Sequence, residues 1–291
     1  MAAHDAYGAP PPRRRPDEAG VSRRSFLRLR RTAAARADID YDGVTVRVRR
    51  AWARAPEPWL RALEPVAPVV AEAAAVGPGQ RVLDVGAGDG NVALACAAVG
   101  AEVEACDLAE AMVERGRART GEAVDWRQGD AQALPYPDAS FDAVISAFGA
   151  TLAPRAKRTA HELVRVCRPS GRVVLAAWIP RGLPGRMFEL SESVAPLPDG
   201  VRSPAEWGTQ AVARRRLEPL LSELELRTRT VALRFASGDA LFAALDPWTP
   251  DFARTELRAG FDRLLAAQNN RPPAAEVDAR YLLAVGRRPA E

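Results

Sequence analysis

The stretch Val82-Leu83-Asp84-Val85-Gly86-Ala87-Gly88-Asp89-Gly90 decides the fold that this sequence predicts. Its apolar run, Val82, Leu83 and Val85, is typical of a strand that is covered on both faces of a parallel sheet. Gly86 and Gly88 permit backbone angles and close approaches that a β-carbon would forbid. The residues that follow place Val92, Cys96 and Val99 on one helical face, up to Gly100. We therefore expect a strand, a tight turn and a helix whose first N–H groups face a polar ligand.

The same alternation of strand and helix continues after this turn. Expected strands cover 81–85, 102–106, 124–127, 141–146 and 172–178, and expected helices cover 91–99, 109–120 and about 155–167. This rhythm is typical of the α/β class, with a doubly wound, Rossmann-like parallel sheet and helices on both faces.

Composition limits the kinds of protein that this chain can be. Of its 291 residues 47% are apolar, enough for a sizeable core, and no apolar run approaches the ~20 residues that span a bilayer. The three cysteines, Cys96, Cys106 and Cys167, fall inside expected core elements. We interpret them as buried thiols of a reducing, cytoplasmic compartment and expect no metal site, because His4 and His161 are the only histidines.

The first 37 residues are predicted to be a disordered basic tail that is rich in proline and arginine. Within it, Ser22–Arg28 resembles a twin-arginine export signal. Arginines interrupt the segment where an apolar region should follow, so we do not expect export. The tail also lacks interleaved aromatic residues and an amphipathic pattern, and we expect neither nucleic-acid binding nor stable membrane insertion.

We divide the remainder of the chain into three parts. Residues 38–179 are predicted to form a Rossmann-like domain for a nucleotide-type cofactor, with helices at its N-terminal end. Residues 180–275 are a variable region that includes one strand of the sheet, and residues 276–291 contain a final strand. Alternating Val44, Val46 and Val48 suggest a short strand over 41–50. Prolines within 54–76 suggest one or two helices. In the variable region we expect a loop over 180–204, a helix over 204–222, a strand over 226–235 and a helix over 255–267.

Polar residues recur where the expected strands end, which is where ligands bind in such sheets. Asp107 comes 21 positions after Gly86 and could accept the hydroxyls of a ribose, or cap the next helix, or do both. Asp130 ends the third strand and could accept an adenine amine, with the Ala131 amide near a ring nitrogen, or be an ordinary turn aspartate. Met112 could pack on the adenine or lie in the core.

Several motifs occur in a fixed order. Gly86-x-Gly88-x-Gly90 after Asp84 resembles motif I of the class I S-adenosylmethionine (SAM)-dependent methyltransferases. The run Leu134–Val144 resembles the L-P-[FY]-x-[DN]-x-[ST]-F-D-x-[VI] sequence of the ubiquinone and menaquinone C-methyltransferase-like (type 11) group. Arg165–Arg172 resembles that group's R-V-L-[RK]-P-G-G-x turn, with Ser170 in place of a glycine. Residues 281–286 resemble its last, antiparallel strand, so the resemblance implies seven strands, mostly parallel.

The resemblance also implies a cofactor, SAM, and residues that would hold it. Carried onto this sequence, they are Asp84, Gly86, Ala87, Gly88, Asp107, Leu108, Met112, Asp130, Ala131 and Ala147. In that group the variable insertion lies over the methyl end of the pocket. We expect the acceptor, a small cyclic or lipophilic molecule, to contact Phe148, Trp178 and Met187. Phe188, Trp207 and Trp248 add further rings to this region, although each single ring could belong to a small core.

The expected reaction is transfer of the SAM methyl group by in-line displacement, for which proximity and alignment can supply roughly 7–11 kcal/mol. No catalytic base is evident, because His161 shares a helix face with Lys157 and Arg165 and should face solvent. Two alternatives remain open: a SAM-binding protein without catalysis and an NAD(P)-dependent oxidoreductase. The second explains the glycine turn and Asp107, although Asn91 replaces the third glycine of the dinucleotide fingerprint. The sequence leaves the acceptor, the methylated atom and the oligomeric state open.

Overall fold

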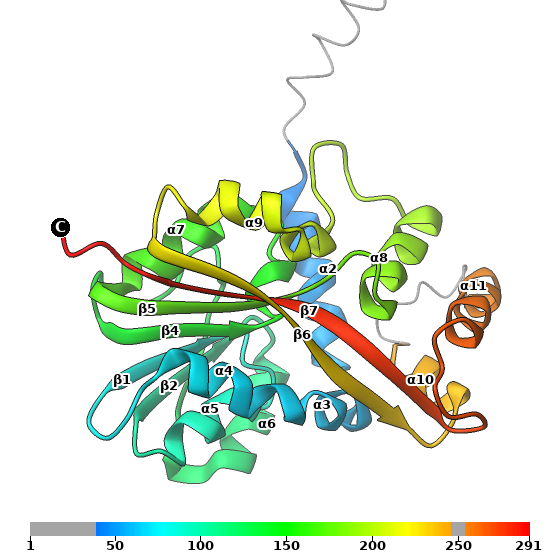
Figure 1. The fold of residues 1–291 in the computed structure, drawn as a ribbon, viewed down its shortest axis with the longest axis horizontal. Helices are drawn as coiled ribbons and strands as arrows, with labels where there is room; N and C mark the ends of the chain where they lie inside the picture. Colours follow the sequence, from blue (N-terminus) through cyan, green and yellow to red (C-terminus); the bar gives the residue numbers. More distant parts are fainter. Residues whose placement is uncertain (1–38, 246–253) are drawn as a thin grey trace, which may run out of the picture. The chain divides into compact units, whose positions relative to one another are not determined.

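Seven strands form one sheet in the computed structural model, which describes residues 39–245 and 254–291. The expected tail over 1–37 and Trp248 lie outside the described residues. The strand order is β3-β2-β1-β4-β5-β7-β6 (Figure 1). The strands are β1 Arg81–Val85, β2 Glu102–Asp107, β3 Asp125–Gln128, β4 Phe141–Ala147, β5 Cys167–Trp178, β6 Ser222–Phe235 and β7 Ala275–Arg287.

β1 to β5 pair in parallel, whereas β7 runs antiparallel between β5 and β6. The expected antiparallel strand over 281–286 is thus confirmed and is longer than predicted. Its central residues align Leu283 with Ala176 of β5 and with Arg227 of β6. This order places the carboxyl ends of β1, β2 and β4 along one edge of the sheet, where a ligand site is expected.

Helices cover both faces of the sheet, as expected (Figure 1). Their bounds are α2 Tyr41–Ala53, α3 Glu57–Ala62, α4 Ala67–Ala74, α5 Asn91–Ala97, α6 Glu110–Thr120, α7 Ala156–Val166, α8 Leu183–Val194, α9 Gln210–Leu217, α10 Gly238–Ala244 and α11 Arg254–Ala266. The helices expected over 54–76, 91–99, 109–120, 155–167 and 255–267 are confirmed, the first of these as α3, a 3₁₀ turn and α4.

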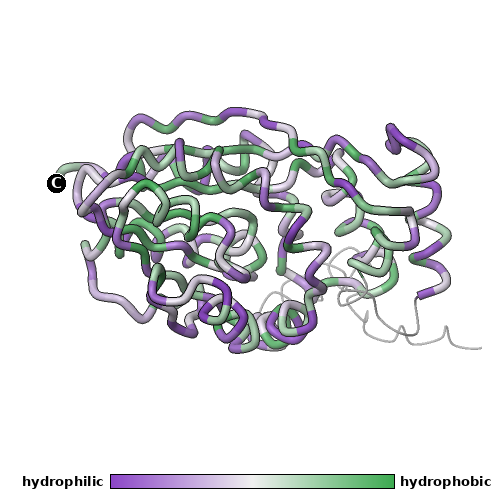
Figure 2. Tube along the Cα trace, turned by 90° about the horizontal axis from the view of Figure 1, so that it is seen from below, coloured by the Kyte–Doolittle hydropathy of each residue, from purple (hydrophilic) through white to green (hydrophobic). Residues whose placement is uncertain are grey.

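Alternate residues along a buried strand belong to two hydrophobic cores, one on each face of the sheet. Val82 of β1 packs with residues of α4 and α5, whereas Leu83 and Val85 pack with residues of α7 and α9 on the other face. Figure 2 shows the hydrophobic colour concentrated along the inner segments and the hydrophilic colour on the outer ones. Asp84 shares a face with Val82, so its carboxyl group is directed into the layer that holds α5.

Two sequence predictions are wrong. Residues 41–50 form most of helix α2 and not a strand, because Val44, Val48 and Ala51 lie at helical spacing and Asp40 caps the helix by accepting from the Gly43 N–H at 2.8 Å. Residues 180–204 are not one long loop, because α8 occupies their middle and buries Leu183 and Met187. The loop was predicted because the segment is rich in proline and glycine, but Pro184 stands at the start of a helix, a position that proline tolerates.

β5 begins earlier than expected. The predicted turn Pro169-Ser170-Gly171 lies inside the strand as an irregularity in its pairing with β4. Ser170 has φ 62° there, the left-handed conformation that a glycine adopts without strain. No helix among the described residues is long and apolar enough to cross a membrane.

Candidate functional site

The glycine turn after β1 is held close to two neighbouring strands. The Gly86 N–H donates to the Cys106 carbonyl of β2 at 2.8 Å, and Gly86 has φ 66°. On its other side, a β-carbon on Gly149 would lie 2.3 Å from the Gly86 oxygen. Both positions therefore need a residue without a side chain, since the backbones after β1 and β4 approach each other directly.

Asp84 is buried behind this turn. Its Oδ2 accepts from the Ala93 N–H in the first turn of α5 at 3.0 Å, and its Oδ1 has no partner among the described atoms. Burial raises the pKa of Asp84 to about 7, with a smaller contribution from the charge of Asp107 and an opposing one from the Ala93 bond. A buried carboxylate oxygen without a partner is costly unless a ligand or water completes it.

Asp107 ends β2 and is also buried. Its Oδ2 accepts from the Gly88 N–H and its Oδ1 from the Ala109 N–H, each at 2.9 Å. Asp107 thus fixes the glycine turn and the segment that leads into α6. The N-cap residue of α6 is Ala109, and no side chain caps this helix, so the prediction that Asp107 caps it is wrong. Burial raises its pKa to about 6 against these hydrogen bonds, which lower it. Each carboxylate oxygen keeps a second lone pair for a further donor.

Asp130 follows β3 and is tied to Gln132, which is 3% exposed. The Gln132 N–H and its side-chain Nε2 both donate to Asp130, at 2.8 and 3.1 Å. The same Nε2 reaches Thr45 of α2 at 3.2 Å, and Oε1 accepts from the Arg155 N–H at 3.0 Å. Gln132 therefore connects the end of β3 to α2 and to the start of α7.

Asp107 and Asp130 line one cleft at the carboxyl edge of the sheet, whereas Asp84 does not line it, because its carboxyl group faces α5. The walls of the cleft include Gly86, Asp107, Leu108, Asp130 and Ala131 from the predicted set. Helix α2 closes it with Thr45, Val48 and Trp52, and the segment after β4 contributes Gly149 and Leu152. The cleft holds about 40 Å³ in this arrangement.

The other predicted cofactor residues lie beside the cleft. Ala87 and Gly88 belong to the glycine turn but do not line the space, and Ala147 ends β4 just before Phe148. Met112 is fully buried with Ala55 and Leu60, which matches its alternative interpretation as a core methionine.

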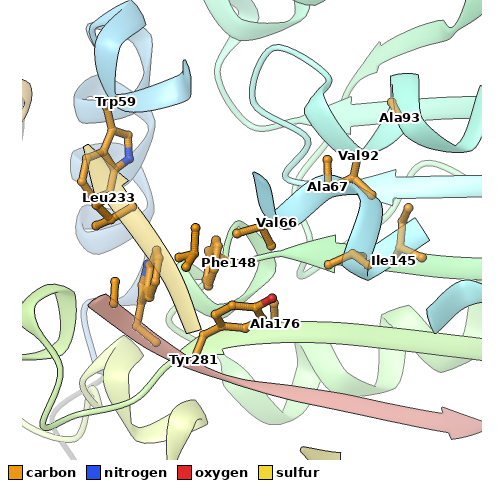
Figure 3. Close-up of a cluster of buried hydrophobic side chains, with 14 of the residues drawn as sticks. Trp59, Val66, Ala67, Val92, Ala93, Ile145, Phe148, Ala176, Leu233 and Tyr281 are labelled. Atoms are coloured by element: carbon orange, nitrogen blue, oxygen red, sulfur yellow. The ribbon is translucent and has the colours of Figure 1, made fainter. Parts of the chain in front are cut away.

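A separate aromatic pocket begins where β4 and β5 end. Phe148 stacks on Trp178 with ring centroids 3.8 Å apart, and Tyr281 of β7 meets both rings edge-on. Figure 3 shows Phe148 and Tyr281 in the same buried cluster as Trp59 of α3 and Leu233 of β6. The three predicted acceptor residues, Phe148, Trp178 and Met187, all line this pocket, which holds about 80 Å³.

Phe148 has φ 69°, which is unusual for an aromatic residue. Such strain persists only where the surroundings hold it, and here the ring stack and a hydrogen bond from its N–H to Ala176 do so. Two other rings that were expected in this region, Phe188 and Trp207, lie in different places. Phe188 lines the pocket, whereas Trp207 is buried on the opposite face of the sheet under the Arg216 guanidinium.

The cleft and the aromatic pocket share two walls, Trp52 and Leu152. Sequence reasoning missed Trp52, Thr45 and Gln132. The spacing of Thr45, Val48 and Trp52 fits one face of a helix and could have revealed the first two, but the alternating valines favoured a strand. His161 is exposed on α7, as predicted.

The two later motifs are joined physically. The Arg165 guanidinium donates to the carbonyls of Leu134 and Tyr136, at 3.1 and 2.8 Å, and pairs with Asp138. Glu162, one turn earlier on α7, accepts from the Leu134 N–H at 2.7 Å. The arginine that opens the second motif thus fixes the proline-rich run of the first.

Comparisons with known proteins agree with this architecture. Residues 83–175 match the family model described as a methyltransferase domain. An uncharacterised protein of Mycobacterium tuberculosis is 40% identical over 152 residues, which cover 51% of this chain and 56% of that protein. A demethylmenaquinone methyltransferase of Clavibacter sepedonicus is 43% identical over 110 residues, 36% of this chain and 45% of that one. The chain thus spans about half the length of the curated relatives it matches.

Solved structures share the fold at lower identity. The YcgJ protein of Bacillus subtilis matches with a TM-score of 0.56 and 22% identity over 76% of this chain and 97% of that one. The [4+2]-cyclase SpnF matches with a TM-score of 0.53 and 21% identity over 82% and 85%. The sheet, like that of these structures, has a Rossmann-like α/β fold. Within this fold, residues 83–175 are similar to a methyltransferase domain.

Proposed function

We propose that this protein transfers a methyl group from S-adenosylmethionine to a small-molecule acceptor. One observation carries the proposal: a cleft lined by carboxylates and an aromatic pocket share the walls Trp52 and Leu152. One space suits a polar nucleoside and the other an apolar acceptor, and their common boundary is where transfer would occur.

The residues of the cleft fit such a cofactor by their chemistry. Asp107 and Asp130 line the cleft, and a carboxylate has about four lone-pair sites, so each can accept hydrogen bonds from a ligand. We assign Asp107 to hydroxyl groups and Asp130 to an amine, whereas Asp84, which faces α5, would act by holding the glycine turn and α5 together. About 40 Å³ is too little for a whole nucleoside, so we infer that α2 moves when the site fills.

When bound, SAM supplies an activated methyl group on a sulfonium. The chain supplies alignment and a dry environment: Phe148, Trp178 and Met187 are each at most 8% exposed and form the wall against which an acceptor would lie. None of the described residues lining the aromatic pocket is His, Asp, Glu, Lys or Cys. The pocket therefore favours an acceptor acidic enough to react without a protein base. The three buried, unpaired cysteines support a reducing, cytoplasmic location.

The test is calorimetric titration with S-adenosylhomocysteine of the wild type, Asp107→Ala and His161→Ala. We expect one-site micromolar binding, about 8 kcal/mol, that Asp107→Ala abolishes and the exposed His161→Ala preserves. Heat with NAD and none with S-adenosylhomocysteine would instead indicate an oxidoreductase. The antiparallel β7 argues against that outcome, because the dinucleotide fold has the strand order 3-2-1-4-5-6.

A second candidate is a protein that binds SAM without transferring its methyl group. The observation that favours it is the fold shared with SpnF, a [4+2]-cyclase, since one architecture can carry different activities. Binding of S-adenosylhomocysteine with no methyl transfer from labelled SAM to any member of a panel of small apolar acceptors would support this second candidate.

A further inference from the structure

A third space, which we call the α2–α8 groove, lies next to the two described above. It holds about 380 Å³ between α2, α8 and the segment 195–204. It shares Leu152, Phe188 and Ser191 with the aromatic pocket and Val48 and Leu152 with the cleft. The groove therefore opens onto the site of the proposed reaction.

The volumes show why this connection matters. About 80 Å³ in the aromatic pocket accommodates a few atoms, whereas ligand sites typically measure roughly 300–1,000 Å³. An acceptor whose reactive end enters the aromatic pocket must leave its remaining atoms elsewhere. The groove has that room, and most of its lining is apolar, including Val44, Leu197 and Val201.

The rim of the groove is basic. Arg47, Arg50 and Arg54 occur at i, i+3 and i+7 of α2 and its end, so they share one helix face, and Arg202 faces them across the groove. Among the described residues, no ion pair or hydrogen bond engages the guanidinium groups of Arg47, Arg50 or Arg202, and all three residues are exposed. Asp42, also on α2, pairs with Arg155 and does not line the groove.

One acid opposes these arginines. Glu192 of α8 lines the groove, and its Oε1 is buried without a partner. Burial raises the pKa of Glu192, helped by the charges of Glu189 and Glu206 and opposed by a hydrogen bond with Ser203. A single carboxyl group whose charged form is disfavoured does not neutralise the guanidinium groups of Arg47, Arg50 and Arg202, so the groove retains a net positive charge.

We propose that the α2–α8 groove binds the acceptor as an anionic amphiphile, with its apolar body on the floor of the groove and its carboxylate or phosphate at Arg47, Arg50 and Arg202. This inference rests on the proposed function for its role in methylation, but binding to the groove can be measured without SAM. Guanidinium groups pair with both kinds of anion in a bidentate manner, and an apolar floor beside them selects against small inorganic anions.

The test is titration of the full chain with decanoate, decyl phosphate and decanol below their micelle concentrations, by calorimetry. We expect saturable one-to-one binding of at least one anion, and binding of decanol at least tenfold weaker. The double substitution Arg47→Gln with Arg202→Gln should weaken anion binding at least tenfold. Arg49→Gln is the matched control, because Arg49 is exposed on the same helix and does not line the groove. Glu192→Gln should leave binding unchanged or tighten it.

Comparison of the two anions distinguishes a carboxylate from a phosphate ligand. Equal affinity for decanol, or equal affinity of the double variant and the wild type, would overturn the proposal. Titration of the same preparations with S-adenosylhomocysteine separates the cofactor hypothesis from the groove hypothesis. If the wild type does not bind S-adenosylhomocysteine, the cofactor assignment is refuted, and the result for the groove still stands.

Discussion

At the residue scale, the two buried aspartates make stability depend on pH in an unusual direction. The folded-state pKa of Asp84, about 7, lies above its unfolded value of 3.8, so its contribution to stability is complete below pH 3.8 and is lost as the pH rises through 7. The slope is at most about 1.4 kcal/mol per pH unit for one group.

Asp84→Asn removes this term. Relative to the wild type, the free energy of unfolding of the variant should improve as the pH rises from 4.5 to 7.5, measured by urea denaturation at each pH. Asp199→Asn, on an exposed loop, is the control and should show a constant difference. A constant difference for Asp84→Asn as well would mean that its carboxyl group titrates normally in the folded protein.

Gly149 tests the contact between the two turns. Gly149→Ala would place a β-carbon 2.3 Å from the Gly86 oxygen, and neither partner is a side chain that can rotate away. Overpacking of this kind costs about 1–3 kcal/mol, so Tm should fall by several degrees and affinity for S-adenosylhomocysteine should fall with it. Gly77→Ala, where a β-carbon meets nothing within 4 Å, should be nearly neutral. Similar thermal melts of the two variants would refute the close approach.

At the scale of elements, Arg165 joins α7 to the run after β3. Arg165→Lys keeps the charge but cannot reproduce the fork that reaches two carbonyls and two carboxylates, so we expect a loss of about 1–2 kcal/mol, visible as a lower urea midpoint. The control is Arg214→Lys, in an exposed pair with Glu218 that should contribute little. Faster amide hydrogen exchange over residues 134–138 in Arg165→Lys, but not in Arg214→Lys, would show that the loss of stability arises in this segment. Unchanged exchange there would contradict the proposed role of Arg165.

The elements also show what sequence could and could not predict. β1 was predicted to the residue, because a buried parallel strand between two turn signals leaves little choice. The helix over residues 41–50 was not predicted, because the alternate valines also fit a strand. The contacts that hold α2 in place come from Gln132 and Arg155, about 90 and 110 positions later in the sequence. The three predicted acceptor residues meet in one pocket. Trp52, which joins that pocket to the cleft, escaped prediction with the helix that carries it.

At the scale of the whole molecule, the cysteines report on global opening. Cys96, Cys106 and Cys167 are all fully buried free thiols, and burial raises the pKa of Cys96 and of Cys167 to about 12. Native protein at pH 7.5 should therefore resist a thiol reagent, and all three thiols should react in one phase in denaturant. Reaction of one cysteine ahead of the others, seen by mass spectrometry, would show that the element that carries it opens independently: α5 for Cys96, β2 for Cys106 or β5 for Cys167.

The position of β7 in the sheet has a consequence for synthesis on the ribosome. Among the described strands β6 pairs only with β7, and β7 also covers the outer edge of β5, although it follows the other six in the sequence. While residues up to 274 emerge, β1 to β5 can already associate, but β5 presents an open edge and β6 has no neighbour. The nascent chain therefore exposes unpaired strand edges, which can pair with other chains, until β7 emerges, and a chaperone would protect it most during that interval.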